Sequence, residues 1–309
     1  MRRILVIGAS GQIGSELISE LKEKYGKDNV IASDKNSNES NSVIELDILD
    51  KFLLINVIKE NRINTIFNLA SILSAKGEKE PLKAWDVNSN GFLNVLEISK
   101  DLKIDRIIWP SSIAAFGPST PQINTPNDTI LDPNTMYGIT KVTGELLSNY
   151  YFQRYNLDIR SVRLPGIISS KTLPGGGTTD YAVEIFYEAI KEKNYTCFVD
   201  RDTVLPMMYM PDCIKCLINL LEADASRLKR RVYNVTSMSF SVKELVAEIK
   251  IHIPDFKIDY RPDFRQEIAN SWPKTIDDSL ARKEWDWNPT YNLKSMTKDM
   301  IETLKKRLL

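Results

Sequence analysis

The chain has little cysteine and almost no histidine: its 309 residues include three cysteines and one histidine. Disulfide frameworks pair an even number of cysteines, usually in short secreted chains, so we expect none here. His252 lies in an amphipathic stretch without a partner motif, which argues against a zinc site and a Ser-His-Asp triad. We therefore expect no metal, and the chemistry must come from other side chains.

Cys213 and Cys216 do form a C-x-x-C pattern, which occurs in redox and metal sites. However, the apolar residues of PDCIKCLINLLEA recur at helical spacing, and no second C-x-x-C accompanies the motif. We expect both cysteines to be buried in a helix.

The sequence also lacks an excess of charge and a long apolar run. Lys plus Arg and Asp plus Glu both number 41, so the formal net charge is zero and a nucleic-acid partner is not favoured. No apolar run reaches the ~18–20 residues that span a bilayer. The opening MRRILVIG has too short an apolar run for a signal peptide. These absences predict a soluble, cytoplasmic protein that does not bind membranes.

What the sequence does contain is an alternation of apolar runs and helical patterns. Strands are expected at 2–8, 29–34, 42–47, 63–71, 105–112 and 157–165, with helices between most of them. This order predicts an α/β fold of the Rossmann type, a doubly wound parallel sheet with helices on both faces. We also expect a polar loop after residue 71, one helix over about 81–102, and an irregular Trp- and Pro-rich segment before a closing helix from about 292.

The first apolar run leads into VIGASGQIG, a G-x-x-G-x-x-G pattern between a strand and a helix. Glycines allow a tight turn there, and backbone N–H groups at the helix N-terminus bind a pyrophosphate. Asp34 ends the next expected strand, where a carboxylate binds the adenosine ribose hydroxyls and repels a 2′-phosphate, so NAD is favoured over NADP. The expected cofactor contacts of the loop are Gly8, Ser10, Gly11, Gln12, Ile13 and Gly14.

Further cofactor contacts are expected where the next strands end, because ligands of open α/β sheets bind at the carboxyl ends of the strands. Asp47 and Ile48 end the third expected strand, where we place the adenine. Leu69, Ala70 and Ser71 end the fourth, and the small residues of this stretch leave room beside the cofactor.

The fifth expected strand runs into PSSIAAFG, which places Ser111 and Ser112 at the same edge of the sheet. In the helix that follows, Tyr137 and Lys141 are four residues apart and therefore share one face. A nearby ammonium, reinforced by a positively charged nicotinamide, favours the phenolate and lowers the tyrosine pKa from about 10 towards working pH. We therefore expect Tyr137 to act as a general base on an oxygen held by the serine hydroxyl.

The glycine loop, NLAS, SSIAAFG and YGITK in this order resemble the extended short-chain dehydrogenase/reductase family, and the resemblance covers essentially the whole chain. It implies a Rossmann domain over 1–166, to which part of 205–240 returns, and a smaller C-terminal α/β substrate domain over 167–309. It also implies a homodimer that pairs through the helices near 81–101 and 135–156.

The resemblance assigns individual roles as well. It implies that Ser112 polarises the substrate oxygen, that Tyr137 is the acid/base, and that Lys141 binds the nicotinamide ribose and lowers the phenol pKa. Asn88, in WDVNSNG, matches the family's asparagine of the central helix, and Ile167 is expected near the nicotinamide.

Two segments, LPGGGTTDYAVEIFYEA and SWPKTIDDSLARKEWDWNP, are similar to the branch of this family that oxidises L-threonine. The similarity implies NAD-dependent oxidation of L-threonine to 2-amino-3-oxobutanoate, with Tyr137 as the base. Asp180 either meets the substrate ammonium or caps the next helix, and Trp272 either closes the pocket or packs in the core. The expected substrate contacts are Ser74, Ser111, Ser112, Tyr137, Gly176, Thr178, Thr179, Asp180 and Trp272.

Other activities of the family remain to be weighed. The 4,6-dehydratases carry an Asp-Glu pair where this chain has Ile113 and Ala114, so dehydration would lack its acids. A UDP-sugar 4-epimerase needs no extra acids and is the alternative function. A non-enzymatic, NAD-sensing protein is disfavoured, because it would have little need for both Tyr137 and Lys141.

Overall fold

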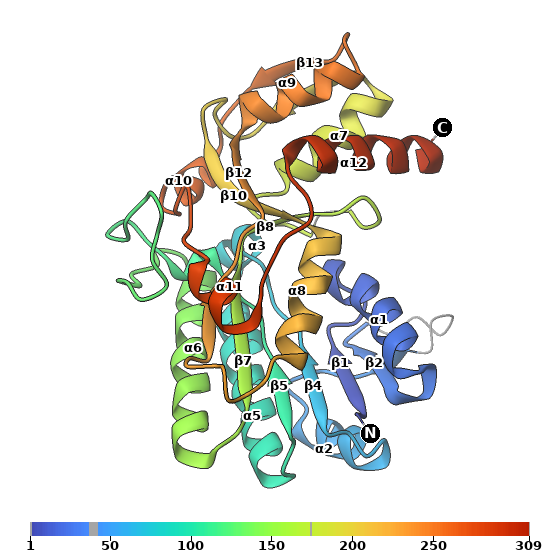
Figure 1. Ribbon diagram of the computed structural model, residues 1–309, viewed down its shortest axis with the longest axis vertical. Coiled ribbons are helices and arrows are strands. Elements are labelled where there is room, and N and C mark those ends of the chain that lie inside the picture. Colours follow the sequence, from blue (N-terminus) through green and yellow to red (C-terminus); the bar gives the residue numbers. More distant parts are fainter. Residues whose placement is uncertain (1, 37–42, 174, 309) are drawn as a thin grey trace.

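The computed structural model describes residues 2–36, 43–173 and 175–308 (Figure 1). Its main sheet has eight strands in the order β11-β7-β5-β4-β1-β2-β3, with β6 paired to β7, and every ladder in it is parallel. The strands are β1 (Ile4–Ile7), β2 (Val30–Asp34), β3 (Val43–Glu45), β4 (Thr65–Asn68), β5 (Arg106–Ile108), β6 (Ser111–Ser112), β7 (Ile159–Leu164) and β11 (Val232–Asn234).

Helices cover both faces of this sheet, which confirms the expected doubly wound architecture (Figure 1). Leu17, Leu21 and the apolar residues of the cysteine helix form one core with Val6, Phe67 and Val162. Leu54, Val95 and Tyr151 form the opposite core with Leu5 and Ile66. The first face carries α1 (Gln12–Tyr25) and α8 (Met210–Glu222), and the second carries α2 (Lys51–Glu60), α5 (Gly91–Asp101) and α6 (Met136–Tyr155).

The later part of the chain forms a smaller assembly beyond the carboxyl edge of the sheet (Figure 1). It has one three-stranded sheet, β12-β10-β8, and one two-stranded sheet, β13-β9, packed with helices around a core of their own. Its elements are β8 (Gly166–Ile168), α7 (Tyr181–Lys191), β9 (Asn194–Cys197), β10 (Val204–Tyr209), β12 (Met238–Ser241), α9 (Val242–His252), β13 (Lys257–Tyr260), α10 (Phe264–Asn270) and α12 (Leu293–Leu308). Residues of α8 and β11 leave this part and pack with the large sheet.

Three details differ from the sequence-based expectations. The expected polar loop contains α3 (Ser74–Lys79), and the segment expected to be irregular contains α10 and α11 (Ser279–Trp285). The expected helix over 81–102 consists of α4 (Pro81–Trp85), a π-helical turn (Asp86–Asn90) and α5, and the Gly91 N–H bonds the Asp86 carbonyl five residues back. Such π turns are common at functional sites. The spacing of apolar residues in the sequence does not predict them.

The prediction for the C-x-x-C pattern is confirmed, because Cys213 and Cys216 are both buried in α8. Gly26, at φ 91°, ends α1 in a conformation that favours glycine. None of the described helices combines the length and apolar character that crossing a membrane requires. In the same described residues, no group of three or more His, Cys, Asp or Glu side chains is placed to hold a metal ion.

Candidate active site

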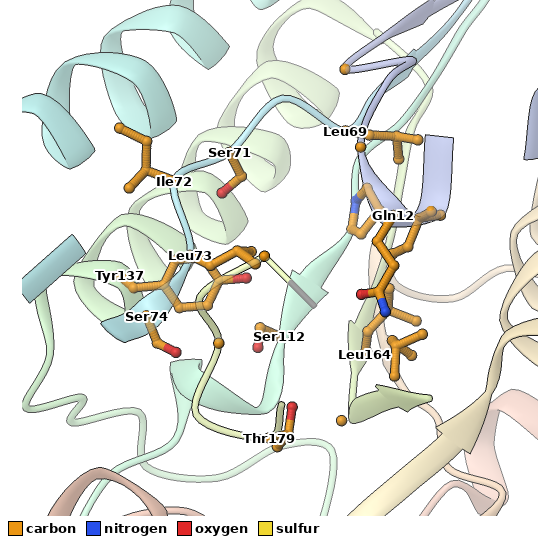
Figure 2. Close-up of a pocket in the computed structure, with 18 of the residues that line it drawn as sticks. Gln12, Leu69, Ser71, Ile72, Leu73, Ser74, Ser112, Tyr137, Leu164 and Thr179 are labelled. Atoms are coloured by element: carbon orange, nitrogen blue, oxygen red, sulfur yellow. The ribbon is translucent and has the colours of Figure 1, made fainter. Parts of the chain in front are cut away.

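A cavity of about 470 Å³ lies at the carboxyl edge of the parallel strands. Its wall combines the turns that follow β1, β4, β5 and β7 with the start of α6 and the glycine loop before α7. Figure 2 shows Gln12 and Tyr137 on opposite walls, with Ser112 between them. The sheet topology therefore brings together motifs that are far apart in the sequence.

The loop after β1 forms one wall and begins with Gly8 at φ +86°, a conformation that favours glycine. A Cβ on Gly14 would lie 2.2 Å from the Gly8 carbonyl oxygen, so only glycine lets α1 start this close to the turn. The N-cap residue of α1 is Gly11, and no side chain caps the helix. Its N–H groups and positive dipole end are therefore available to an anionic ligand.

The acidic residues expected on the adenosine side lie beside this wall. Asp34 accepts a hydrogen bond from the Ser10 backbone N–H at 2.9 Å, so its carboxylate lies next to the glycine loop. Burial favours a higher pKa for Asp47, but its hydrogen bond from Lys35, at 2.6 Å, lowers that pKa overall. Ile48 packs over Gly91. Asp34, Asp47 and Ile48 do not line the cavity itself.

Several buried polar atoms of the wall have no protein partner within the described part of the chain. They are the Gln12 Nε2 atom, both amide atoms of Asn68 and the Ser71 hydroxyl. Buried polar groups normally form hydrogen bonds, so these atoms point to a ligand with both donors and acceptors. With the glycine cradle and the open helix N-terminus, they fit the phosphates and riboses of a dinucleotide. Asn68 was not selected from the sequence, although a polar residue at the end of a buried strand was a usable signal.

Ser112, Tyr137 and Lys141 meet on the other side of the cavity. Thr135 caps α6 by accepting a hydrogen bond from the Gly138 N–H at 3.1 Å. A Cβ on Gly138 would lie 2.2 Å from the Ala114 carbonyl oxygen, so this helix start is pressed against the turn that follows Ser112. The fit fixes Tyr137 relative to the serine.

Lys141 lies behind the tyrosine ring. Its ammonium nitrogen is 5.3 Å from the centre of the Tyr137 ring and donates to the Pro110 carbonyl at 2.8 Å. Burial lowers the pKa of Lys141 to about 7, although the charge of Glu145 opposes this. Burial also raises the pKa of Tyr137 to about 12, against a hydrogen bond with Ser112. In the protein alone, burial therefore outweighs the lowering of the phenol pKa that was expected from the lysine.

The remaining wall comes from α3 and the glycine loop. The Ser74 and Thr178 hydroxyls are 3.0 Å apart, and the Thr178 N–H donates to Ser74 at 3.2 Å. The Asp180 carboxylate accepts from the Gly176 and Gly177 N–H groups at 2.8 and 2.7 Å. Asp180 occupies the N-cap position of α7, but its side chain forms no cap bond there, which argues against the second of the two alternatives for this residue. Burial raises the pKa of Asp180.

The other expected residues take distinct places. Thr179, Trp272 and Ile167 line the cavity, and Trp272 is also part of the core. Gly176 lies just outside, between Gly175 and Gly177, which do line it. Asn88 is likewise outside the lining.

Two more of the expected contacts, Asn88 and Ser111, form hydrogen bonds with other parts of the protein. The Asn88 amide holds the Ile72 backbone through two bonds of 2.8 and 3.0 Å. The Ser111 hydroxyl donates to Glu145 at 2.6 Å. Cavity residues that the sequence did not suggest include Ile72, Leu73, Lys76, Leu164 and Leu173.

Comparison with known families identifies this arrangement. Residues 4–236 match the model of the NAD dependent epimerase/dehydratase family. The chain belongs to that family. The match agrees with the resemblance to the extended short-chain dehydrogenases/reductases, and it means that the protein is an enzyme of an NAD-dependent family.

Individual relatives narrow the comparison. An uncharacterized epimerase/dehydratase of Staphylococcus aureus (strain MRSA252) is 46% identical, over 99% of this chain and 98% of its own length. The structure of an L-threonine dehydrogenase from Phytophthora infestans matches with a TM-score of 0.97 at 50% identity, covering 99% of this chain and 100% of that one. An L-threonine dehydrogenase from Clostridium difficile matches with a TM-score of 0.96 at 49% identity, covering 99% and 98%.

Proposed function

We propose that this protein oxidises L-threonine at C3 with NAD, giving 2-amino-3-oxobutanoate, NADH and a proton. One observation carries the proposal: Ser112, Tyr137 and Lys141 share a single cavity with the glycine loop after β1 and the loop before α7. A dinucleotide and a small substrate can therefore meet at these three side chains. The similarity to L-threonine dehydrogenase structures at 49–50% identity supports the choice of substrate.

The proton chemistry follows from the Tyr137–Lys141 pair. The pKa is about 7 for Lys141 and about 12 for Tyr137, so at a pH between these two values the pair together holds one titratable proton. When that proton is on Lys141, Tyr137 is a phenolate and can accept the proton of the 3-hydroxyl group. Ser112 donates a hydrogen bond to the same substrate oxygen and holds it in place. NAD, when bound, supplies the acceptor for the hydride that leaves C3.

The cavity also suits the rest of an amino acid. Asp180 is the acidic side chain in the described lining, and we assign it to the substrate ammonium. Lys76 also lines the cavity, and its charge acts on Glu80, which forms its salt bridge with Lys83. We assign Lys76 to the substrate carboxylate. Leu73 and Leu164 offer apolar surface to the C4 methyl group.

Absorbance of NADH tests the proposal. The purified protein is mixed with NAD and, in separate reactions, L-threonine, D-threonine, L-serine, UDP-glucose or UDP-galactose. We expect net NADH formation with L-threonine. Interconversion of the UDP-sugars without net NADH would instead indicate the 4-epimerase, and NAD binding without any turnover would indicate a binding protein.

A further inference from the structure

A buried ion pair lies behind the strand that carries Ser112. Glu145 of α6 is 3% exposed and Arg163 of β7 is 5% exposed. The guanidinium donates to both carboxylate oxygens, with Nε–Oε1 at 2.9 Å and Nη2–Oε2 at 2.8 Å. A buried ion pair does not by itself imply a gain in stability, because the free energy of removing both charges from water offsets most of their attraction. This raises the question of what else the carboxylate does.

The Glu145 carboxylate is hydrogen-bonded to the end of the strand that carries Ser112. Its Oε1 atom accepts from the Ser111 hydroxyl at 2.6 Å. One helical turn earlier, Lys141 holds the Pro110 carbonyl at 2.8 Å. Two side chains of α6 therefore fasten the two residues before Ser112.

Glu145 is also the charged group next to Lys141, since side chains four residues apart on a helix are neighbours. It opposes the effect of burial on the pKa of that lysine. The charge of Arg163 also acts on the Asp128 carboxylate. The other groups that contact the pair and Arg163 in the described part of the chain carry no formal charge. They are Tyr137, the Trp109 and Phe116 rings, the Pro110 and Asn127 carbonyls, the Ser111 hydroxyl and the Asn234 amide.

We propose that Glu145 is a positioning residue of the active site: it fixes the strand end before Ser112 and supplies the negative charge that keeps the Lys141 ammonium behind Tyr137. The proposal rests on the proposed oxidation for its kinetic readout. The two roles are separable, because one depends on a hydrogen bond and the other on charge.

Glu145→Gln tests the charge, since glutamine keeps the shape and an acceptor oxygen. Without the negative charge, the state in which both Tyr137 and Lys141 are protonated becomes less stable. The acid limb of the pH–rate profile should then move to lower pH by about one unit, the lower end of the effect of a close opposite charge. The plateau rate should fall about tenfold or more, because the phenolate–ammonium form loses its support.

Ser111→Ala is the matched control. It removes the hydrogen bond to the strand end and leaves the Glu145 charge in place. We expect a lower plateau rate with the acid limb at its wild-type pH. A double variant, Glu145→Gln with Arg163→Gln, removes both charges of the ion pair and is used if the single variant does not fold.

The affinity for NAD, measured by tryptophan fluorescence across the same pH range, reports the protonation state of the Tyr137–Lys141 pair without any turnover. A doubly protonated pair repels the positively charged nicotinamide, so binding should weaken on the acid side, and at lower pH in the Glu145 variant than in the wild type. If L-threonine is not oxidised but this binding shift is seen, the proposed substrate is wrong and the role of Glu145 stands. An acid limb that stays in place in the Glu145 variants, or that moves equally in Ser111→Ala, would overturn the inference.

Discussion

Replacing Lys141 with methionine should change stability in opposite directions at low and high pH. In the folded protein, burial lowers the pKa of Lys141 from 10.5 to about 7. An unfolded lysine binds its proton more tightly, so the folded state carries a penalty that is complete below pH 7 and disappears as the pH rises to about 10.5. At about 1.36 kcal/mol per pKa unit, the full penalty is about 5 kcal/mol.

Methionine removes this penalty but leaves the Pro110 carbonyl without the bond it receives from Lys141 at 2.8 Å. A buried carbonyl that loses its partner costs about 1–3 kcal/mol. At pH 6 the variant should therefore be more stable than the wild type by roughly 2–4 kcal/mol. Near pH 10.5 it should be less stable by about 1–3 kcal/mol.

Urea denaturation followed by tryptophan fluorescence at pH 6, 8 and 10 measures the difference between the two proteins. Lys305→Met is the control, because Lys305 is exposed on α12 and should show no such change of sign. A difference between wild type and Lys141→Met that does not vary with pH would show that Lys141 is not held at a lowered pKa, and the proton chemistry proposed for the Tyr137–Lys141 pair would have to be abandoned.

Three other predictions follow from the same site and its surroundings. Tyr137→Phe should bind NAD normally in a fluorescence titration but lose turnover by about 10²–10⁴-fold, the usual range for a general base; normal turnover would remove Tyr137 from the mechanism. Asp34→Ala should weaken the binding of NAD and reduce the preference for NAD over NADP. An unchanged ratio of the two affinities would argue against a contact between Asp34 and the ribose. We also propose that two copies pair through the helices over about 81–101 and 135–156. Leu82 of the first and Leu146 and Tyr150 of the second are 80%, 64% and 53% exposed. Leu146→Glu should turn a dimer into a monomer in light-scattering measurements, and a monomeric wild type would contradict the proposal.

The large sheet could be predicted because its central strands, such as β1, β4 and β7, are buried on both faces. Ile4 to Ile7 are each at most 1% exposed, so the strand is a continuous apolar run that is visible without any structure. The glycine spacing was equally informative, since a Cβ at Gly14 would clash with the Gly8 carbonyl. The spacing of Tyr137 and Lys141 was informative as well, because residues four apart lie on the same face of a helix.

What could not be predicted depends on contacts between distant segments. α3 buries Ser74 and Ala75 and packs on α6, and its short sequence has no apolar period of its own. The bond between Ser111 and Glu145 spans 34 residues, and nothing local distinguishes Ser111 from Ser112. The position of Asp180 in the sequence is compatible with a helix cap, but its carboxylate accepts hydrogen bonds from the N–H groups of the preceding glycines. The lowered pKa of Lys141 depends on burial, which spacing does not reveal.

The pairing of β11 with β7 has a consequence for synthesis on the ribosome. The edge of β7 that β11 covers stays open until residues 232–234 have left the exit tunnel, because Val232 pairs with Ser161. A nascent chain that has released only the first half of the molecule therefore presents an unpaired strand, the kind of edge at which chains associate wrongly. Translation of the later segment closes that edge, so the ribosome must deliver both halves before the large sheet is complete.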